Sequence, residues 1–438
     1  MLSQDSQPLN RNADGVMAAT GAPPIATYGE VFVDGAIIEL IRGAQDGSPE
    51  LMLWDGTKET IGARVEHRGQ LYEPAPITAS ILRELNLSTH RCTHGSTCEF
   101  LEATCKLVAT YTGLPEKSTS LVGRFVLATA LVEALSVAPT LTIVGPDTAR
   151  GNRLMELLRC LCRHSLPLTG VTPAGFCSLA SGARFTYLIS QACVGDKLHT
   201  LLDDVTSRER KIPFRGRLLD LFGVQVIHSA SHVAGDSRAL RSIQIPMIST
   251  GHDLPVFDFD TRLRITNDFQ AKSLSFRRAS LDMACKMDFD ASNFAFALRD
   301  RARSLATATP DDRELQAGVF NLLREEDAEI RADRLIDPSV IAGEAVLVGW
   351  HGSPAGTVYV ADLAVFAQEI LRRRGEATTI EPAVFGKQLK LLGFVTERDA
   401  KGKKLRLTEA VRDRAQELVR DIGAPEGSDG PRQSERES

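Results

Sequence analysis

The sequence is poor in aromatic residues and has no large excess of charge of either sign. Aromatic residues make up 6% of the 438 residues, and only two of them are tryptophan. A formal net charge of -5 gives the whole chain no attraction for nucleic acid, so any such contact must be local. A hydrophobic share of 43% and a charged share of 24% are ordinary for a globular protein, and the length fits two or three domains of ~150 residues each.

The chain also lacks a secretory leader pattern, a disulfide framework and an unbroken membrane span. No basic segment followed by an apolar one opens the sequence, and its eight cysteines are irregularly spaced. The apolar stretch 125–144 contains a single charge, Glu133, and Pro139 divides it into a helix-like part and a strand-like part. We therefore expect a cytoplasmic protein with reduced thiols and no membrane partner.

The rest of the chain is organised around residues 141–158, which have the pattern of a strand, a turn and a helix. The apolar run 141–144 leads into a loop bounded by Gly145 and Gly151, and apolar residues at helical spacing follow from Leu154. This pattern is typical of a phosphate-binding loop (P-loop), where an anion binds at a helix N-terminus. The candidate nucleotide- or anion-binding residues are Gly145, Asp147, Thr148, Arg150, Gly151, Asn152 and Arg153.

This loop lacks the side chains that phosphoryl transfer requires. A working P-loop has lysine and then serine or threonine after its second glycine, but Asn152 and Arg153 stand here, and five residues rather than four separate the glycines. A later strand, expected to carry a magnesium-binding acid at its end (the Walker B position), ends in Ser190 and Gln191 instead. We expect no catalytic residue and no metal, and leave open the binding of ATP or another nucleotide without tight magnesium.

Strand-like and helix-like segments alternate around this loop. Apolar runs at 140–144, 185–189, 224–227 and 242–246 are separated by helical patterns, which predicts an α/β domain with a P-loop NTPase-like parallel sheet and helices. The predicted domains are a disordered start at 1–26, a small antiparallel β unit at 27–76, a helical lead-in with the degenerate P-loop domain at 77–275, a helical connector at 276–350, a winged helix at 351–423 and a disordered tail at 424–438.

Two clusters of polar residues allow more than one interpretation. The group His90, Cys92, His94 and Cys98 has metal-ligand chemistry, but its spacing fits no common zinc site, and Ser96 or Thr97 with Glu99 looks like a helix start. The basic residues between Arg208 and Arg217 could contact phosphates or pair with Asp203, Asp204 and Glu209. Both questions stay open at this point.

The C-terminal region has the order helix, helix, β-wing, helix, which predicts a winged helix. Winged helices commonly place the helix before the wing in the major groove of DNA and the wing along phosphates. Residues 381–406 carry a local charge of +4 within an acidic protein, which favours DNA as a partner. The candidate DNA-binding residues are Lys387, Lys390, Arg398, Lys401, Lys403, Lys404 and Arg406. The alternative is a winged helix used for packing or for protein contact.

With these segments placed, the sequence resembles a bacterial family related to the P-loop ATPase-like domains of phage and mobile-element primase-helicase proteins. The resemblance rests on the stretches 141–154, 160–168, 172–175, 215–221 and 385–394. It implies that Gly151 matches the second P-loop glycine, that Asn152 and Arg153 match the lysine and threonine, and that Ser190 and Gln191 match the acidic strand end. The catalytic motifs are therefore degenerate.

Taken together, the sequence predicts a degenerate P-loop protein that binds DNA, has weak or no ATP hydrolysis, and is an accessory or regulatory factor in DNA transactions of mobile elements. One alternative is an active, DNA-dependent oligomeric ATPase in which Arg150 or Arg153 replaces the P-loop lysine. Another is a protein-interaction scaffold that does not bind DNA. An oligomer or a protein partner remains open in each case.

Overall fold

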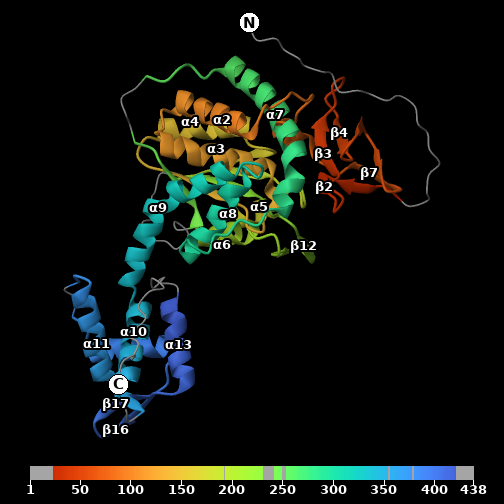
Figure 1. Ribbon diagram of the computed structural model, residues 1–438. Coiled ribbons are helices and arrows are strands. Elements are labelled where there is room, and N and C mark those ends of the chain that lie inside the picture. The colour runs from red at the N-terminus through yellow and green to blue at the C-terminus, as the bar shows by residue number, and fades with distance from the viewer. Residues whose placement is uncertain are drawn as a thin grey trace, which may run out of the picture. The chain divides into compact units, whose positions relative to one another are not determined.

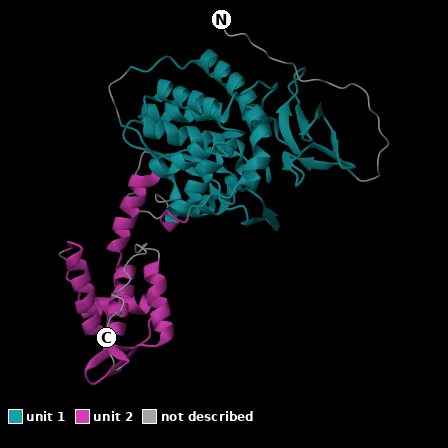
Figure 2. Ribbon diagram, viewed as in Figure 1, with its two compact units in different colours: residues 1–291, 297–322 teal, residues 292–296, 323–438 magenta. Residues whose placement is uncertain are grey.

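The computed structural model describes residues 23–191, 193–229, 241–248, 253–353, 356–376 and 379–420. The chain divides into two compact units (Figure 2). Unit 1 comprises residues 1–291 and 297–322, and unit 2 comprises residues 292–296 and 323–438. Of the two segments predicted to be disordered, residues 1–22 and the whole of 424–438 lie outside the described residues, whereas Ile25–Thr27 forms strand β1.

A five-stranded parallel sheet forms the centre of unit 1. The strand order is β14-β8-β13-β10-β9, and every neighbouring pair is parallel. The strands are β8 (Thr140–Val144), β9 (Ser165–Thr169), β10 (Thr186–Ser190), β13 (Val224–His228) and β14 (Ile243–Pro246). The predicted α/β class with a parallel sheet is therefore confirmed, and the arrangement is consistent with a P-loop-like fold.

Helices cover this sheet because its central strands are apolar on both faces (Figure 1). Tyr187 and Ile189 of β10 share an apolar cluster with Leu198 and Leu202 of α6. Since side chains alternate along a strand, Leu188 faces the opposite side of the sheet. The helices of unit 1 are α1 (Ala79–Glu84), α2 (Thr97–Thr112), α3 (Glu116–Ala130), α4 (Thr148–Leu161), α5 (Pro173–Phe176), α6 (Asp196–Val205), α7 (Phe259–Lys286), α8 (Arg299–Thr307) and the start of α9 (Arg313–Leu335).

The stretch 125–144 contributes the end of α3, a 3-10 turn η1 (Val132–Ala134) and β8. Twelve residues of α3 are buried, which accounts for the apolar composition of this segment. Among the described residues, no helix is long and apolar enough to cross a membrane.

Two small sheets precede the central one. The first has the order β2-β3-β4-β5 and is antiparallel, and the second has the order β1-β7-β6, in which β1 and β7 are parallel. Asp34-Gly35 and Asp55-Gly56 lie in the turns that connect β2 to β3 and β4 to β5. The remaining strands are β2 (Gly29–Val31), β3 (Ile37–Arg42), β4 (Pro49–Trp54), β5 (Glu59–Gly62), β6 (Val65–His67) and β7 (Gln70–Pro74).

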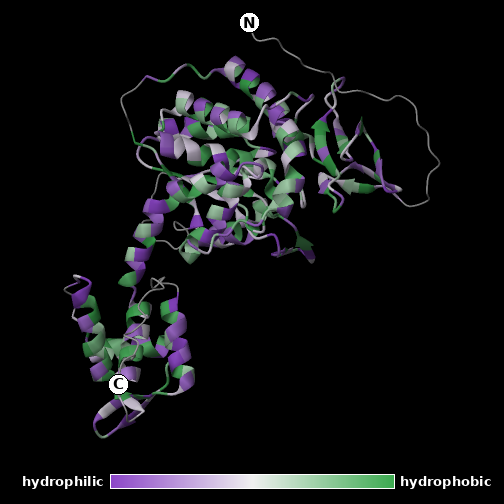
Figure 3. Ribbon diagram, in the orientation of Figure 1, coloured by the Kyte–Doolittle hydropathy of each residue, from purple (hydrophilic) through white to green (hydrophobic). Residues whose placement is uncertain are grey.

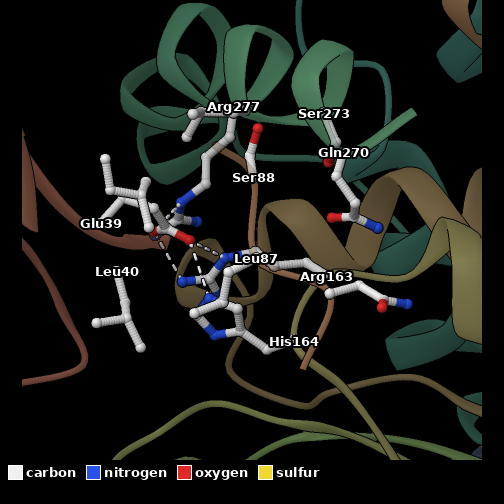
Figure 4. Close-up of a pocket in the computed structure, with 12 residues that line it drawn as sticks. Glu39, Leu40, Leu87, Ser88, Arg163, His164, Gln270, Ser273 and Arg277 are labelled. Atoms are coloured by element: carbon white, nitrogen blue, oxygen red, sulfur yellow. Dashed lines mark hydrogen bonds and ion pairs between the residues drawn. The ribbon is translucent and has the colours of Figure 1, made fainter. Parts of the chain in front are cut away.

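A buried ion-pair network joins β3 to the helices of the central domain (Figure 4). Glu39 of β3 accepts hydrogen bonds from Arg163 Nε and Nη2 at 2.6 and 2.8 Å and from Arg277 Nε of α7 at 2.9 Å. Arg277 also donates to both carboxylate oxygens of Glu133 at 2.6 and 3.0 Å. His164 Nε2 lies 3.3 Å from Glu39. Three segments distant in sequence therefore meet at the Glu39 carboxylate: β3, residues 163–164 and α7.

Both carboxyl groups of this network are held ionised. Burial alone would raise the pKa of Glu133, but Arg163 and Arg277 lower it to about 2. Burial would also raise the pKa of Glu39, but the same two arginines hold it well below its ordinary range. Burial and the neighbouring Arg163 lower the pKa of His164, which favours its neutral form. The network therefore has two arginine charges facing two carboxylate charges.

Unit 2 contains the C-terminal helices and a three-stranded antiparallel sheet of order β15-β17-β16. Its elements are the end of α9, α10 (Pro338–Gly352), β15 (Thr357–Tyr359), α11 (Val360–Arg373), α12 (Pro382–Leu391), β16 (Thr396–Asp399), β17 (Gly402–Arg406) and α13 (Glu409–Arg420). Phe385, Leu389 and Leu405 belong to its apolar core.

The segment predicted as a helical connector, 276–350, is divided between the units in the structure. The division falls within α9, and α10 packs into the core of unit 2 with α11 and α13. Gly343 permits the close approach of α13, since a Cβ atom there would lie 3.0 Å from the carbonyl oxygen of Ala415. Ile341, Ala345 and Val346 of α10 are also buried and belong to the same apolar core.

Candidate functional site

The first candidate site lies at the carboxyl ends of β8 and β13, which are neighbours in the central sheet. The chain continues from β8 to β9 at one edge of the sheet and from β13 to β14 at the other edge. Adjacent strands whose connections run in opposite directions form a topological switch point, and ligands of open α/β sheets bind there. The predicted P-loop begins at this point.

Gly145 holds the start of this loop against the end of β14. Its φ of +123° lies in a region that side chains disfavour, and a Cβ atom would lie 2.5 Å from the carbonyl oxygen of Met247. Met247 N donates to Val144 O at 2.6 Å, which fixes the close approach. The first loop glycine is therefore required by backbone packing between two strands.

The loop itself is shorter than the spacing of its glycines predicted. Helix α4 begins at Thr148 because the Asp147 carboxylate caps it, accepting a hydrogen bond from Arg150 N at 3.0 Å. The second carboxylate oxygen of Asp147 lies 3.4 Å from Arg150 Nε. An internal carboxylate thus occupies the helix N-terminus, where a phosphate would bind in a P-loop.

Gly151 lies inside α4, where it contacts His228 at the end of β13. A Cβ atom at Gly151 would lie 2.4 Å from His228 Nε2. His228 is 8% exposed, and its Nδ1 atom has no hydrogen-bond partner among the described residues. Burial lowers the pKa of His228, which favours the neutral imidazole. His228 belongs to no motif of the sequence. Gly151 within a helical pattern is the only hint of this contact in that segment, because glycine there costs about 1 kcal/mol relative to alanine.

The two arginines of the loop are both engaged by other parts of unit 1. Arg153 Nη1 donates to Pro255 O at 2.8 Å, and its guanidinium lies 5.7 Å from the ring centre of Phe257. Arg150 is buried beside Asp147. Thr148 and Asn152, by contrast, have exposed side chains on the first turns of α4. The predicted site residues are near one another, but these contacts direct both guanidinium groups toward protein atoms.

Ser190 and Gln191 lie next to His228, as the parallel sheet requires. Ser190 is in register with His228, and Gln191 N donates to His228 O at 3.3 Å. The Gln191 side chain accepts from Val171 N at 3.0 Å and donates to Cys193 O at 3.1 Å. This amide therefore holds two neighbouring loops together, at a strand end where a magnesium site would need a carboxylate.

The segment that contains the histidine and cysteine cluster leads into α2. Ser96 and Glu99 form a capping box that begins α2 at Thr97, as the sequence indicated. The ring of His94 packs edge-on against Phe100 and Phe276. Among the described residues, no group of three or more His, Cys, Asp or Glu side chains is placed to hold a metal ion.

The second candidate site is the basic surface of unit 2, formed by α12 and the β16–β17 hairpin. Phe385 and Leu389 of α12 point into the core, so Lys387 and Lys390 are left exposed on the opposite face together with Val384. Five cations of this surface have no ion-pair partner among the described residues: Lys387, Lys390, Arg398, Lys401 and Lys403. The surface therefore carries positive charge that the described residues do not neutralise.

The hairpin between β16 and β17 is held by Asp399. Its Oδ1 atom accepts hydrogen bonds from Lys401 N at 2.8 Å and Gly402 N at 3.1 Å. Lys404 Nζ lies 3.2 Å from the other carboxylate oxygen, and Arg406 lies 3.6 Å from Glu397. The backbone hydrogen bond from Lys401 lowers the pKa of Asp399. Lys404 and Arg406 thus brace the hairpin while Lys401 and Lys403 extend from it.

No protein family model matches the chain, and no curated protein matches it. Among solved structures, the apo A form of the NrS-1 C-terminal region (305–718) is 12% identical, with a TM-score of 0.33 and coverage of 85% of this chain and 96% of that chain. Drosophila ORC bound to DNA is 12% identical, with a TM-score of 0.20 and coverage of 81% and 95%. Cdc6p from Pyrobaculum aerophilum is 12% identical, with a TM-score of 0.17 and coverage of 70% and 95%. Likenesses this weak do not establish a function for the chain.

Proposed function

We propose that the protein binds DNA through unit 2 and that its P-loop-like domain does not hydrolyse ATP at a substantial rate. The observation that carries the proposal is the set of five cations on α12 and the β16–β17 hairpin that have no ion-pair partner within the described ranges. In a winged helix, α12 enters the major groove and the hairpin lies on phosphates. The helical face with Lys387 and Lys390 then meets base edges or the groove backbone, and Lys401 and Lys403 meet the phosphates.

The capped loop supports the second half of the proposal. A phosphate approaching the N-terminus of α4 would meet the Asp147 carboxylate instead of free N–H groups. Neither Ser190 nor Gln191 can replace a magnesium-binding acid. We therefore place the protein among accessory or regulatory factors in DNA transactions, and the resemblance of its sequence points to mobile elements as their setting.

The rival ATPase hypothesis requires Arg150 or Arg153 to turn toward a nucleotide. Arg153 would have to leave Pro255 and Phe257, and Arg150 would have to leave Asp147. DNA-stimulated ATP turnover that disappears in an Arg153→Ala variant would favour this rival. Absent or salt-insensitive DNA binding would favour the scaffold hypothesis, under which the winged helix contacts protein.

Fluorescence anisotropy with labelled duplex DNA tests the proposal in the full chain. The test variant combines Lys387→Ala, Lys401→Ala and Lys403→Ala, and the control combines Arg372→Ala and Arg373→Ala at the far end of α11. Those two arginines are exposed cations of the same unit that pair with Glu369, so the control removes two positive charges where the test variant removes three.

Each phosphate contact contributes roughly 0.9 to the slope of log K against log salt, so a lost contact weakens binding up to about eightfold at 0.1 M salt. We expect the test variant to bind more weakly and with a shallower slope, and the control to keep both. Wild-type affinity and slope in the test variant would refute DNA binding through this surface.

A further inference from the structure

Two exposed apolar side chains lie on α12 beside the cations of the basic surface, and contacts with phosphates do not use them. Val384 is 57% exposed and Leu391 is 88% exposed. Figure 3 shows hydrophilic residues along the β16–β17 hairpin that follows α12 in the chain and that Figure 1 labels. Exposed apolar residues that are rimmed by polar ones are typical of an interaction site.

Val384, Lys387 and Leu391 share one face of α12. Residues at positions i, i+3 and i+7 of an α-helix lie roughly one above the other. Phe385 and Leu389, at the intervening positions, are buried in the core of unit 2. The outward face of α12 therefore has an apolar residue near each end and a lysine between them.

The exposed side chains of α12 limit what this helix can recognise in a major groove. Arginine, asparagine and glutamine read guanine and adenine through paired hydrogen bonds, and acidic side chains accept from cytosine, whereas aliphatic side chains contact the C5 methyl group of thymine. The exposed residues of α12, all of which the structure describes, are Pro382, Ala383, Val384, Lys387, Lys390 and Leu391. This face is therefore suited to thymine methyl groups, and its lysines remain available for phosphates or guanine.

Charge favours DNA over a second copy of the chain as the occupant of this face. In a symmetric dimer the same patch meets itself, so Lys387 and Lys390 would face the same lysines of the other copy. A duplex instead presents phosphates on both sides of its base edges. In unit 1, by contrast, Arg210 and Lys211 of the other basic cluster each pair with an aspartate.

We propose that Val384 and Leu391 give the protein a sequence preference by contacting thymine methyl groups in the major groove. The inference rests on the proposed function, because it requires α12 to enter that groove. Positions seven residues apart in an α-helix are separated by about 10.5 Å along its axis, and the bases of one strand are spaced by about 3.4 Å. For a helix that lies along the groove, the two side chains therefore reach thymines roughly three base pairs apart.

Selection from a pool of random-sequence duplex DNA by the full chain identifies the preferred site, in which we expect two such thymine positions. Each thymine is then replaced by uracil, which keeps the hydrogen-bonding groups of thymine but lacks its methyl group. The loss of one buried methyl contact should weaken binding about fourfold at each position. The slope of log K against log salt should stay the same, because no phosphate contact is lost.

Single substitutions assign each methyl group to one side chain. Val384→Ala should abolish the effect of uracil at one position, and Leu391→Ala should abolish it at the other. Both residues are exposed and alanine is favourable in a helix, so neither change should destabilise unit 2. The matched control is Val365→Ala on α11, where the valine is 64% exposed and belongs to neither α12 nor the hairpin. The control should keep both effects of uracil.

The outcomes separate this inference from the proposed function. If the variant that lacks Lys387, Lys401 and Lys403 binds weakly but wild type binds thymine and uracil duplexes equally, unit 2 binds DNA without reading methyl groups, and only the inference fails. An effect of uracil that persists in both alanine variants also overturns it. If the lysine variant binds as wild type does and uracil has no effect, both proposals fail. A lower molar mass of the free protein in either alanine variant, measured by analytical ultracentrifugation, would overturn the inference in favour of a second copy.

Discussion

Replacing Glu39 by glutamine should be among the most damaging single substitutions in unit 1. Glu39 is 4% exposed and accepts hydrogen bonds from two arginines, which are themselves 5% and 2% exposed. Glutamine keeps the size of the side chain but removes its charge, so Arg163 and Arg277 are left to share Glu133. Breaking a buried pair in this way costs about 3–5 kcal/mol, a large part of the ~5–15 kcal/mol that stabilises a typical domain.

Tryptophan fluorescence can assign the loss of stability caused by Glu39→Gln to unit 1. Trp54 lies in β4 of unit 1, where the Arg278 guanidinium is 4.2 Å from its ring centre, and Trp350 lies in α10 of unit 2. In a Trp350→Phe background, the change of fluorescence with urea therefore follows unit 1 alone. The control is Glu84→Gln, which removes an exposed pair with Arg159 and should cost at most about 1 kcal/mol.

Glu39→Gln should also change how the stability of unit 1 depends on pH in the acid range. Unfolded glutamate has a pKa of about 4.3, whereas the pKa of Glu133 is about 2 and that of Glu39 is well below its ordinary range. Carboxylates with a lowered pKa stabilise the folded state above about pH 4.3, and this contribution is lost as the pH falls toward 2. The difference between wild type and Glu39→Gln should therefore shrink in this range. A loss at neutral pH no larger than that of Glu84→Gln would refute the role assigned to the network.

Two further predictions concern the loop after β8. Gly151→Ala should destabilise unit 1 by about 1–3 kcal/mol, because the added methyl group would lie 2.4 Å from His228 Nε2. Adding His228→Ala to this variant should restore part of the lost stability in urea unfolding. If the effects of the two substitutions are purely additive, the contact is contradicted. Asp147→Gly removes the carboxylate at the N-terminus of α4 and should cost only a few tenths of a kcal/mol of stability. Inorganic phosphate should then raise the thermal unfolding temperature of the variant more than that of wild type. An equal rise in both proteins would show that Asp147 does not exclude anions.

The central sheet could be predicted from the sequence because its strands are buried on both faces. Runs such as 185–189 and 224–227 are almost wholly apolar, and turn or helix signals separate them. Helix α2 could also be located, since the capping box of Ser96 and Glu99 acts over three residues. Signals that lie within one element or one turn were sufficient in these cases.

The geometry of the candidate site could not be predicted in the same way. The spacing of Gly145 and Gly151 favoured a long loop, but the competing N-cap at Asp147 starts the helix earlier. The contact of Gly151 with His228 joins residues 77 positions apart, and Glu39 meets Arg163 and Arg277 across 124 and 238 positions. No local periodicity contains such information. The DNA-binding residues remain a prediction, although their exposure is now known.

If the protein lacks ATP hydrolysis as proposed, the early start of α4 determines what would be needed to build an ATPase from it. A lysine at position 152 would lie on the second turn of α4, which begins at Thr148. Its amine would therefore not face a phosphate-binding loop. A new loop would first have to lengthen the connection after Gly145 and displace the Asp147 cap, with His228 made smaller to free the backbone near Gly151. Under the proposed function, conversion of this chain into an ATPase would thus require a change in the length and path of the loop, and point substitutions alone would not be sufficient.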